Sequence, residues 1–244
     1  MNEHDDYMAD FMTVFQTIER WGPGTDADSL KALALLPTTP QNIIDIGCGK
    51  GFSTSLLAQH TTAHITAVDN EQNALDELAD RLTKLQLDTR VTLSCSSMTE
   101  LPFTEECFDL IWSEGSAYIM GVEQALQQWR PLLKRKGCMV FSDLVWLTNT
   151  PSPEADEFWQ QEYPDMKTVE KRLAQIQQAG FEVIDHFKLS EQAGFDYYNP
   201  LKERVIALKP SMPESLAIAD LEREIAIYER YPTEFGYHMF VLQK

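Results

Sequence analysis

Two hydrophobic periodicities alternate along the chain. Short runs of apolar and β-branched residues predict seven strands, at 42–46, 63–68, 90–95, 108–113, 138–143, 181–189 and 235–242. Longer segments carry apolar residues at spacings of three and four, which predicts helices at 52–59, 71–85, 122–133, 167–179, 201–208 and 213–231. This order predicts an α/β fold with a doubly wound, mostly parallel sheet, because parallel neighbours need crossover connections.

The two ends of the chain depart from this alternation. Residues 1–40 are helical in character on both sides of a break at 21–24, so we expect an N-terminal helical cap over one end of the sheet. A helical insertion at about 190–232 precedes the last strand, which should enter antiparallel because it leaves little room for a crossover. We therefore expect the cap followed by a single domain over 41–244.

The net charge of the chain disfavours some classes of binding partner. Lys and Arg number 20 against 38 Asp and Glu, so the net charge is −18 over 244 residues. Such a chain repels nucleic acids and anionic membranes unless basic residues gather in one place. The densest basic run, at 134–136, is expected to end a helix before Gly137. We expect no nucleic-acid partner and no membrane partner.

The cysteines and the N-terminus indicate a compartment. Four cysteines stand singly, without CxxC spacing or paired histidines, which disfavours a disulfide framework and a zinc site. The acidic N-terminus lacks the cationic and apolar regions of a secretion signal. We expect a cytoplasmic protein with reduced thiols and no metal, and the sequence indicates no oligomeric state.

The strongest chemical signal follows the first predicted strand. Asp45 precedes three alternating glycines, Gly47, Gly49 and Gly51, and a helix begins directly after them. Glycines permit backbone angles and close approaches that a Cβ forbids, and a helix N-terminus presents free amides. This pattern predicts a ligand-binding loop.

The spacing of the loop bears on the ligand. Dinucleotide folds use G-x-G-x-x-G, whereas this chain has G-x-G-x-G. A carboxylate at Asp45 suits a cationic amino group better than a pyrophosphate. Asp69 ends the next strand, where an acid accepts from ribose hydroxyls. That acid also occurs in NAD-binding folds, so it supports a ribose without choosing between the two cofactors.

With these features the chain resembles the class I S-adenosylmethionine-dependent methyltransferases over roughly 42–143. The resemblance is carried by D-x-G-C-G-x-G at 45–51, S-S-M-T-E-L-P-F at 96–103 and C-F-D-L-I-W-S at 107–113. It implies a Rossmann-like sheet, S-adenosylmethionine as cofactor and a small-molecule methyl acceptor. It also implies the cofactor-binding residues, which are Asp45, Gly47, Gly49, Asp69, Asn70, Ser97, Met98 and Ser113. Ser97 stands where the family most often has Asp, so it is a weaker partner for adenine.

The acceptor is expected beyond the carboxyl ends of the strands, where open α/β sheets bind ligands. Glu114 follows the fourth strand directly and is our candidate catalytic residue, either as a base or as an anchor for a cationic acceptor. Tyr118 and Trp146 are candidate aromatic walls of the same pocket.

Two other functions stay open. One is a module that binds S-adenosylmethionine without methyl transfer, and the other is an NAD-dependent oxidoreductase, which the glycine spacing disfavours. The N/D-P-P-Y tetrad of the family's DNA and amide methylases is absent after the fourth strand, where S-E-G-S stands at 113–116. Methyl transfer to a small molecule is therefore the preferred hypothesis.

Overall fold

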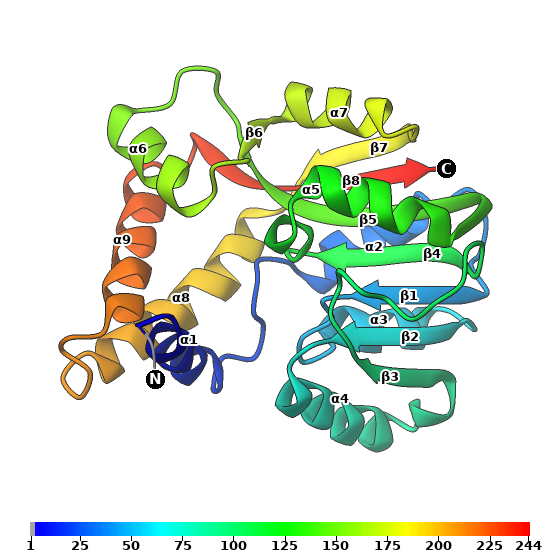
Figure 1. Cartoon of the computed structure of the whole chain (residues 1–244), viewed down its shortest axis with the longest axis horizontal. Helices are drawn as coiled ribbons and strands as arrows, with labels where there is room; N and C mark the ends of the chain where they lie inside the picture. The colour runs from blue at the N-terminus through cyan, green and yellow to red at the C-terminus, as the bar shows by residue number, and fades with distance from the viewer. Residues whose placement is uncertain (1–2) are drawn as a thin grey trace.

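A computed structural model describes residues 3–244 and is built around one eight-stranded sheet (Figure 1). The sheet order is β3-β2-β1-β4-β5-β8-β7, with β6 beside β5. The strands are β1 (Asn42–Ile46), β2 (His64–Asp69), β3 (Val91–Cys95), β4 (Phe108–Glu114), β5 (Leu133–Trp146), β6 (Lys167–Thr168), β7 (Glu182–Lys188) and β8 (Phe235–Gln243). Strands β1 to β6 pair in parallel, and β8 runs antiparallel to β5 and β7.

This architecture confirms the predicted α/β class and the antiparallel last strand. The sheet has one strand more than the seven expected, because Lys167 and Thr168 pair with β5 instead of opening a helix. Thr168 then caps the next helix through its side chain. The two residues therefore join the sheet and also begin the crossover.

Helices lie on both faces and at one end of the sheet. They are α1 (Glu3–Phe15), α2 (Asp26–Ala34), α3 (Phe52–His60), α4 (Gln72–Leu85), α5 (Val122–Trp129), α6 (Pro153–Glu162), α7 (Val169–Gln178), α8 (Glu191–Leu208) and α9 (Leu216–Arg230). Helix α6 is not among those predicted from periodicity, and α8 begins ten residues earlier than expected. The earlier start of α8 follows from its aromatic stretch, which is itself helical and packs Tyr197 and Tyr198 inward.

One sequence expectation fails at the start of β5. The basic run from Lys134 to Lys136 was expected to end a helix, but α5 ends at Trp129 and β5 begins at Leu133. Pro131 lies in the short 3₁₀ turn between them, where its missing N–H ends the α-helical pattern. The sheet register then jumps from Phe108–Leu133 to Leu110–Cys138, so the basic run bulges out of the strand pair.

The sheet is buried on both faces. In β1, Ile43 packs into the core shared with α2 and α3, and Ile44 packs into the core shared with α5 and α7. Successive side chains of a strand point to opposite faces, so a strand covered on both sides reads as a continuous apolar run. This burial explains why the central strands were easy to recognise.

The helices at the end of the sheet enclose the site. Helix α1 packs against α8 and α9, and Figure 1 shows these three helices grouped at the end toward which β1, β2 and β4 point. Helix α2 instead contacts α3 and β8. Residues 3–40 are therefore divided between two places. Within residues 3–244, none of the helices combines the length and apolar character needed to cross a membrane.

Candidate active site

The loop between β1 and α3 is shaped by its glycines. Gly47, Gly49 and Gly51 have φ angles of 71°, 51° and 72°, a region that L side chains rarely adopt. A Cβ at Gly47 would lie 2.4 Å from Ser116 Oγ, and one at Gly51 would lie 2.1 Å from Leu78 Cδ1. The loop is therefore glycine-rich both for its conformation and for close packing.

The loop borders a cavity of about 300 Å³ between the sheet edge and α1. Of the residues predicted to bind the cofactor or acceptor, the cavity is lined by Asp45, Gly47, Gly49, Asp69, Asn70, Met98, Glu114 and Tyr118. The opposite wall is formed by α1 and the segment after it, including Phe15 and Trp21. The predicted residues are thus brought together from four strand ends into one site.

Asp45 is a carboxylate buried to 2% exposure. Thr54 Oγ1 donates to its Oδ2 over 2.5 Å, and no described Lys, Arg or His forms an ion pair with it. Burial raises the pKa of Asp45 to about 7, against the lowering effect of the Thr54 hydrogen bond. A buried acid without a cation is suited to bind an ammonium group from a ligand.

Asp69 organises the loop from the neighbouring strand. Its Oδ2 accepts from the Gly49 amide over 2.7 Å, and its Oδ1 accepts from the Glu71 amide over 3.0 Å. A carboxylate has about four acceptor sites, so these two bonds leave room for ribose hydroxyls. Beside it, the Met98 carbonyl is held by the Trp129 indole N–H over 3.1 Å.

Two predicted cofactor residues lie outside the cavity wall. Ser97 is exposed and shares a 2.8 Å hydrogen bond with Thr99. Ser113 is fully buried, and its hydroxyl lies 2.7 Å from that of Ser116. Ser116 lines the cavity, donates to the Ile46 carbonyl and supports Gly47. Sequence reasoning missed Ser116, although it stands in the same S-E-G-S stretch.

Glu114 lines the cavity, but its carboxylate is already engaged. Ser29 Oγ donates to Oε1 over 2.6 Å, the Trp112 indole donates to the same oxygen over 2.9 Å, and Arg20 forms an ion pair with Oε2. Arg20 and Ser29 come from the N-terminal segment. Glu114 therefore connects that segment to the end of β4.

Trp21 and Lys50 hold the same segment over the glycine loop. The Trp21 indole donates to the Phe15 carbonyl over 3.0 Å, and the indole ring is the neighbour that a Cβ at Gly49 would meet. Lys50 Nζ donates to the Gln16 carbonyl over 2.6 Å. Neither contact was predicted, because each joins residues that are distant in the sequence.

The two predicted aromatic walls have different positions. Tyr118 lines the cavity and packs edge-on against Tyr163, with ring centroids 5.5 Å apart. Trp146 does not line this cavity. It packs instead against Phe235 in an apolar cluster that includes residues of α6. It also borders a separate hollow of about 370 Å³.

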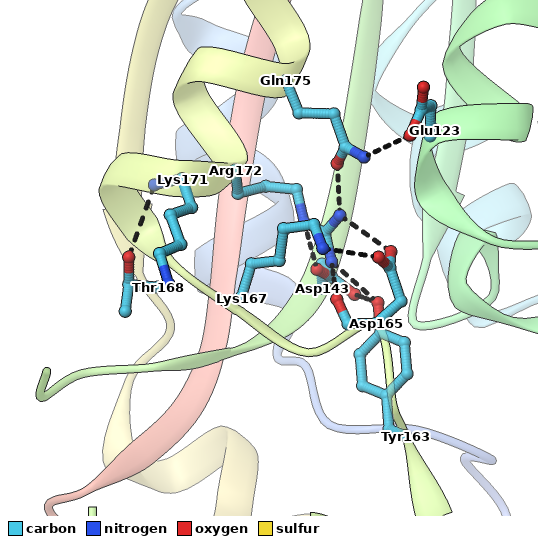
Figure 2. Close-up of polar contacts among 9 residues, drawn as sticks. All are labelled: Glu123, Asp143, Tyr163, Asp165, Lys167, Thr168, Lys171, Arg172 and Gln175. Atoms are coloured by element: carbon cyan, nitrogen blue, oxygen red, sulfur yellow. Dashed lines mark hydrogen bonds and ion pairs between the residues drawn. The ribbon is translucent and has the colours of Figure 1, made fainter. Parts of the chain in front are cut away.

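A buried ion pair supports the wall behind Tyr118 (Figure 2). Arg172 is fully buried on α7, and its Nε donates to Asp143 Oδ2 over 2.9 Å. Tyr163 donates its hydroxyl proton to Asp143 and accepts from Arg172, both over 2.9 Å. Asp165 accepts from the same guanidinium. The network fixes residues 163–165, which follow α6, against the end of β5.

The fold and the cavity together define a class of protein. A glycine loop at a strand-to-helix turn, an acid at the end of the next strand and a buried acid suited to an ammonium group fit a nucleoside cofactor that carries a cationic amino group. These features are those of a Rossmann-like fold that binds S-adenosylmethionine.

Comparison with known proteins finds a family match over part of the chain. Residues 43–137 match the methyltransferase domain family. The chain is 23% identical over 155 residues to methyltransferase GfsG of Streptomyces halstedii, covering 62% of this chain and 56% of that protein. It is 30% identical over 113 residues to the malonyl-[acyl-carrier protein] O-methyltransferase of Herminiimonas arsenicoxydans, covering 46% and 40%. The chain thus spans about half the length of the curated relatives it matches.

A solved structure extends the likeness to the whole fold. The S-adenosylmethionine-dependent methyltransferase from Geobacter sulfurreducens, in complex with S-adenosyl-L-homocysteine, superposes with a TM-score of 0.81 at 18% identity, covering 95% of this chain and 96% of that one. The fold of this chain is thus that of a solved S-adenosylmethionine-dependent methyltransferase, and residues 43–137 match a methyltransferase domain, as the glycine motif predicted.

Proposed function

We propose that this protein transfers the methyl group of S-adenosylmethionine to a small-molecule acceptor bound between the sheet edge and helices α1 and α8. The observation that carries the proposal is Asp45, a buried carboxylate without a described cationic partner, beside the three-glycine loop. The cofactor's amino group supplies the missing positive charge. We also propose a cytoplasmic location, in keeping with four unpaired cysteines.

Different residues on the cavity wall would bind different parts of the cofactor. Asp45 would hold the amino group, the amides of the glycine loop the carboxylate, and Asp69 with Asn70 the ribose. Met98 would form one side of the adenine site. When bound, S-adenosylmethionine supplies a methyl group on a sulfonium that is already a strong electrophile.

The chain's own contribution is then to position the acceptor and exclude water. Trp21 and Lys50 hold the segment after α1 over the glycine loop, which closes the cavity from one side. Glu114 serves this closure through Arg20 and Ser29. Its use as a base would first require one of these bonds to break. We retain 1–40 as a cap and 41–244 as the domain that it covers.

The cofactor assignment is tested by calorimetry with S-adenosylhomocysteine and, in parallel, with NADH. Asp69→Ala should weaken S-adenosylhomocysteine binding by about 2 to 4 kcal/mol, roughly thirty-fold to several hundred-fold, because two charge-assisted bonds to ribose and the support of Gly49 are lost. The matched control is Asp76→Ala on the exposed face of α4, which should bind normally. An Asp69→Ala affinity within about threefold of the wild type would refute the ribose assignment, and tight binding of NADH would favour the oxidoreductase.

Methyl transfer itself is tested with isotopically labelled S-adenosylmethionine and a broad extract of metabolites. An enzyme should label one acceptor or a small group of related acceptors in preference to all others. Tight cofactor binding without labelling of any acceptor would instead identify a binding module.

A further inference from the structure

A group of packed tyrosines lies next to the cofactor cavity, and one of them contacts a carboxylate. Tyr198 donates its hydroxyl proton to Glu224 Oε1 over 2.9 Å. Its ring packs edge-on against Tyr197, with centroids 4.9 Å apart, and stacks on Tyr228 at 3.8 Å. Tyr197 also lines the cofactor cavity. The group therefore begins where the proposed cofactor site ends.

The group is assembled from separate elements. Tyr197 and Tyr198 lie on α8, Glu224 on α9 and Tyr237 on β8. Tyr197 and Tyr198 are buried. Burial and then the charge of Glu224 raise the pKa values of both phenols, and Glu224 contributes to the same rise at Tyr237. Tyr198 and Tyr237 also line one hollow of about 260 Å³, and Tyr198 contacts the carboxylate directly.

Glu224 lacks a partner of opposite charge. Burial raises its pKa to about 7, and the charge of Glu162 adds to this rise. No described Lys, Arg or His forms an ion pair with it. A second acid, Asp220, lies one turn before it on α9 and accepts a hydrogen bond from Tyr7. The surroundings of Glu224 are therefore aromatic and acidic.

We propose that Glu224, Tyr197, Tyr198 and Tyr237 form the acceptor subsite, and that it takes a small molecule carrying an ammonium group. Aromatic faces attract desolvated cations, and a carboxylate removed from water binds a cation more strongly than an exposed one. An anionic acceptor would meet two or more acids in the same place. This inference rests on the proposed function, because it assigns the acceptor of that reaction.

The test uses the full chain saturated with S-adenosylhomocysteine. Choline and ethanolamine, which is protonated at neutral pH, are titrated against it, with 3,3-dimethylbutan-1-ol as the neutral analogue of choline. Saturation-transfer NMR follows the ligand signals. We expect at least one ammonium probe to bind saturably, and at least tenfold more tightly than the neutral alcohol.

Variants locate the binding. Glu224→Gln keeps the size of the side chain and removes its charge, so it should weaken ammonium binding at least tenfold and leave S-adenosylhomocysteine affinity within about twofold. The matched control is Glu229→Gln, an exposed position on the same helix that pairs with Lys202. This control should bind the probe as the wild type does.

The outcomes separate the two proposals. Failure of the wild type to bind S-adenosylhomocysteine would overturn the proposed function. Normal S-adenosylhomocysteine binding without saturable binding of either ammonium probe would overturn only the acceptor subsite. Equal probe affinity in Glu224→Gln and the wild type would overturn it as well.

Discussion

Asp45 is a buried acid and Glu224 a half-buried one, and neither has a described cation beside it. Burial raises the pKa of each to about 7. Each is adjacent to a different part of the proposed reaction centre, Asp45 to the glycine loop and Glu224 to the tyrosines of α8. At the residue scale, such groups predict where a cationic ligand will bind and how that binding depends on pH.

The prediction at this scale concerns the pH dependence of cofactor binding. A cationic amino group binds the ionised form of Asp45, so S-adenosylhomocysteine affinity should fall up to about tenfold as the pH drops from 8 to 6 through a pKa of about 7. The other charged groups that face Asp45 are Glu114, Asp69 and Arg20. Asp45→Asn should bind weakly at every pH, with a flat profile by calorimetry. A wild-type affinity that does not change between pH 6 and 8 would contradict this role.

At the scale of elements, the N-terminal segment acts through its connection to β4. Glu114 is 7% exposed and its partner Arg20 is 17% exposed, so the ion pair is largely removed from water. Breaking such a pair leaves a charge without its partner, which costs more than the loss of an exposed ion pair. The same carboxylate holds Ser29 at the start of α2.

Glu114→Gln should therefore lower the free energy of unfolding by about 1 to 3 kcal/mol, measured by urea denaturation. Hydrogen exchange in residues 3–25 should become faster. Arg20→Gln should give a similar loss, and the double variant should lose less than the sum of the two, because both changes break the same pair. Unchanged stability with a kcat about a hundred-fold lower would instead support Glu114 as the base.

The Arg172 network makes a second element-scale prediction. Arg172→Met would leave Asp143 buried without its ion pair and detach residues 163–165 from β5, so we expect a loss of about 3 to 5 kcal/mol in unfolding free energy. Lys171→Met on the exposed side of the same helix is the control, and should have little effect. Adding Asp143→Asn to Arg172→Met should restore part of the stability. No restoration would indicate that the lost packing, rather than the stranded charge, dominates.

At the scale of the whole molecule, the raised carboxylate pKa values set the pH dependence of stability. The pKa is about 7 for Asp45 and Glu224 and about 6 for Asp143, against about 4 in an unfolded chain. The folded state thus holds more protons in this range, so stability falls as the pH rises. His238 acts in the opposite sense, because burial lowers its pKa to about 4 and the unfolded chain binds that proton more readily.

Between pH 6 and 8, the three acids change the unfolding free energy by more than this histidine does. We expect the unfolding free energy of the ligand-free protein to be about 1 to 3 kcal/mol higher at pH 6 than at pH 8, by urea denaturation. Asp45→Asn should reduce this difference. A protein that is more stable at pH 8 would show that at least one of these acids is ionised in the fold at a lower pH than its burial implies.

The sequence by itself determined the features that depend on neighbours along the chain. The strands of the central sheet were visible because burial on both faces produces continuous apolar runs, as at Ile43 and Ile44. The glycine loop was visible because positive φ angles and the close approach of Ser116 and Leu78 admit only glycine. Asp69 was visible because the end of the strand after that loop has a fixed place in the fold.

The tertiary structure decided which side chains meet across long separations. Arg20 pairs with Glu114 from 94 residues away, and Tyr198 reaches Glu224 on the next helix. No local pattern indicates such pairs, since the sequence around each partner alone is typical of an ordinary surface charge or a core aromatic residue. For the same reason, the sequence did not reveal that Trp146 and Ser113 lie outside the cavity wall. Which side of a wall a side chain faces depends on strand register and on the elements that pack there, and these are fixed only when the whole sheet has formed.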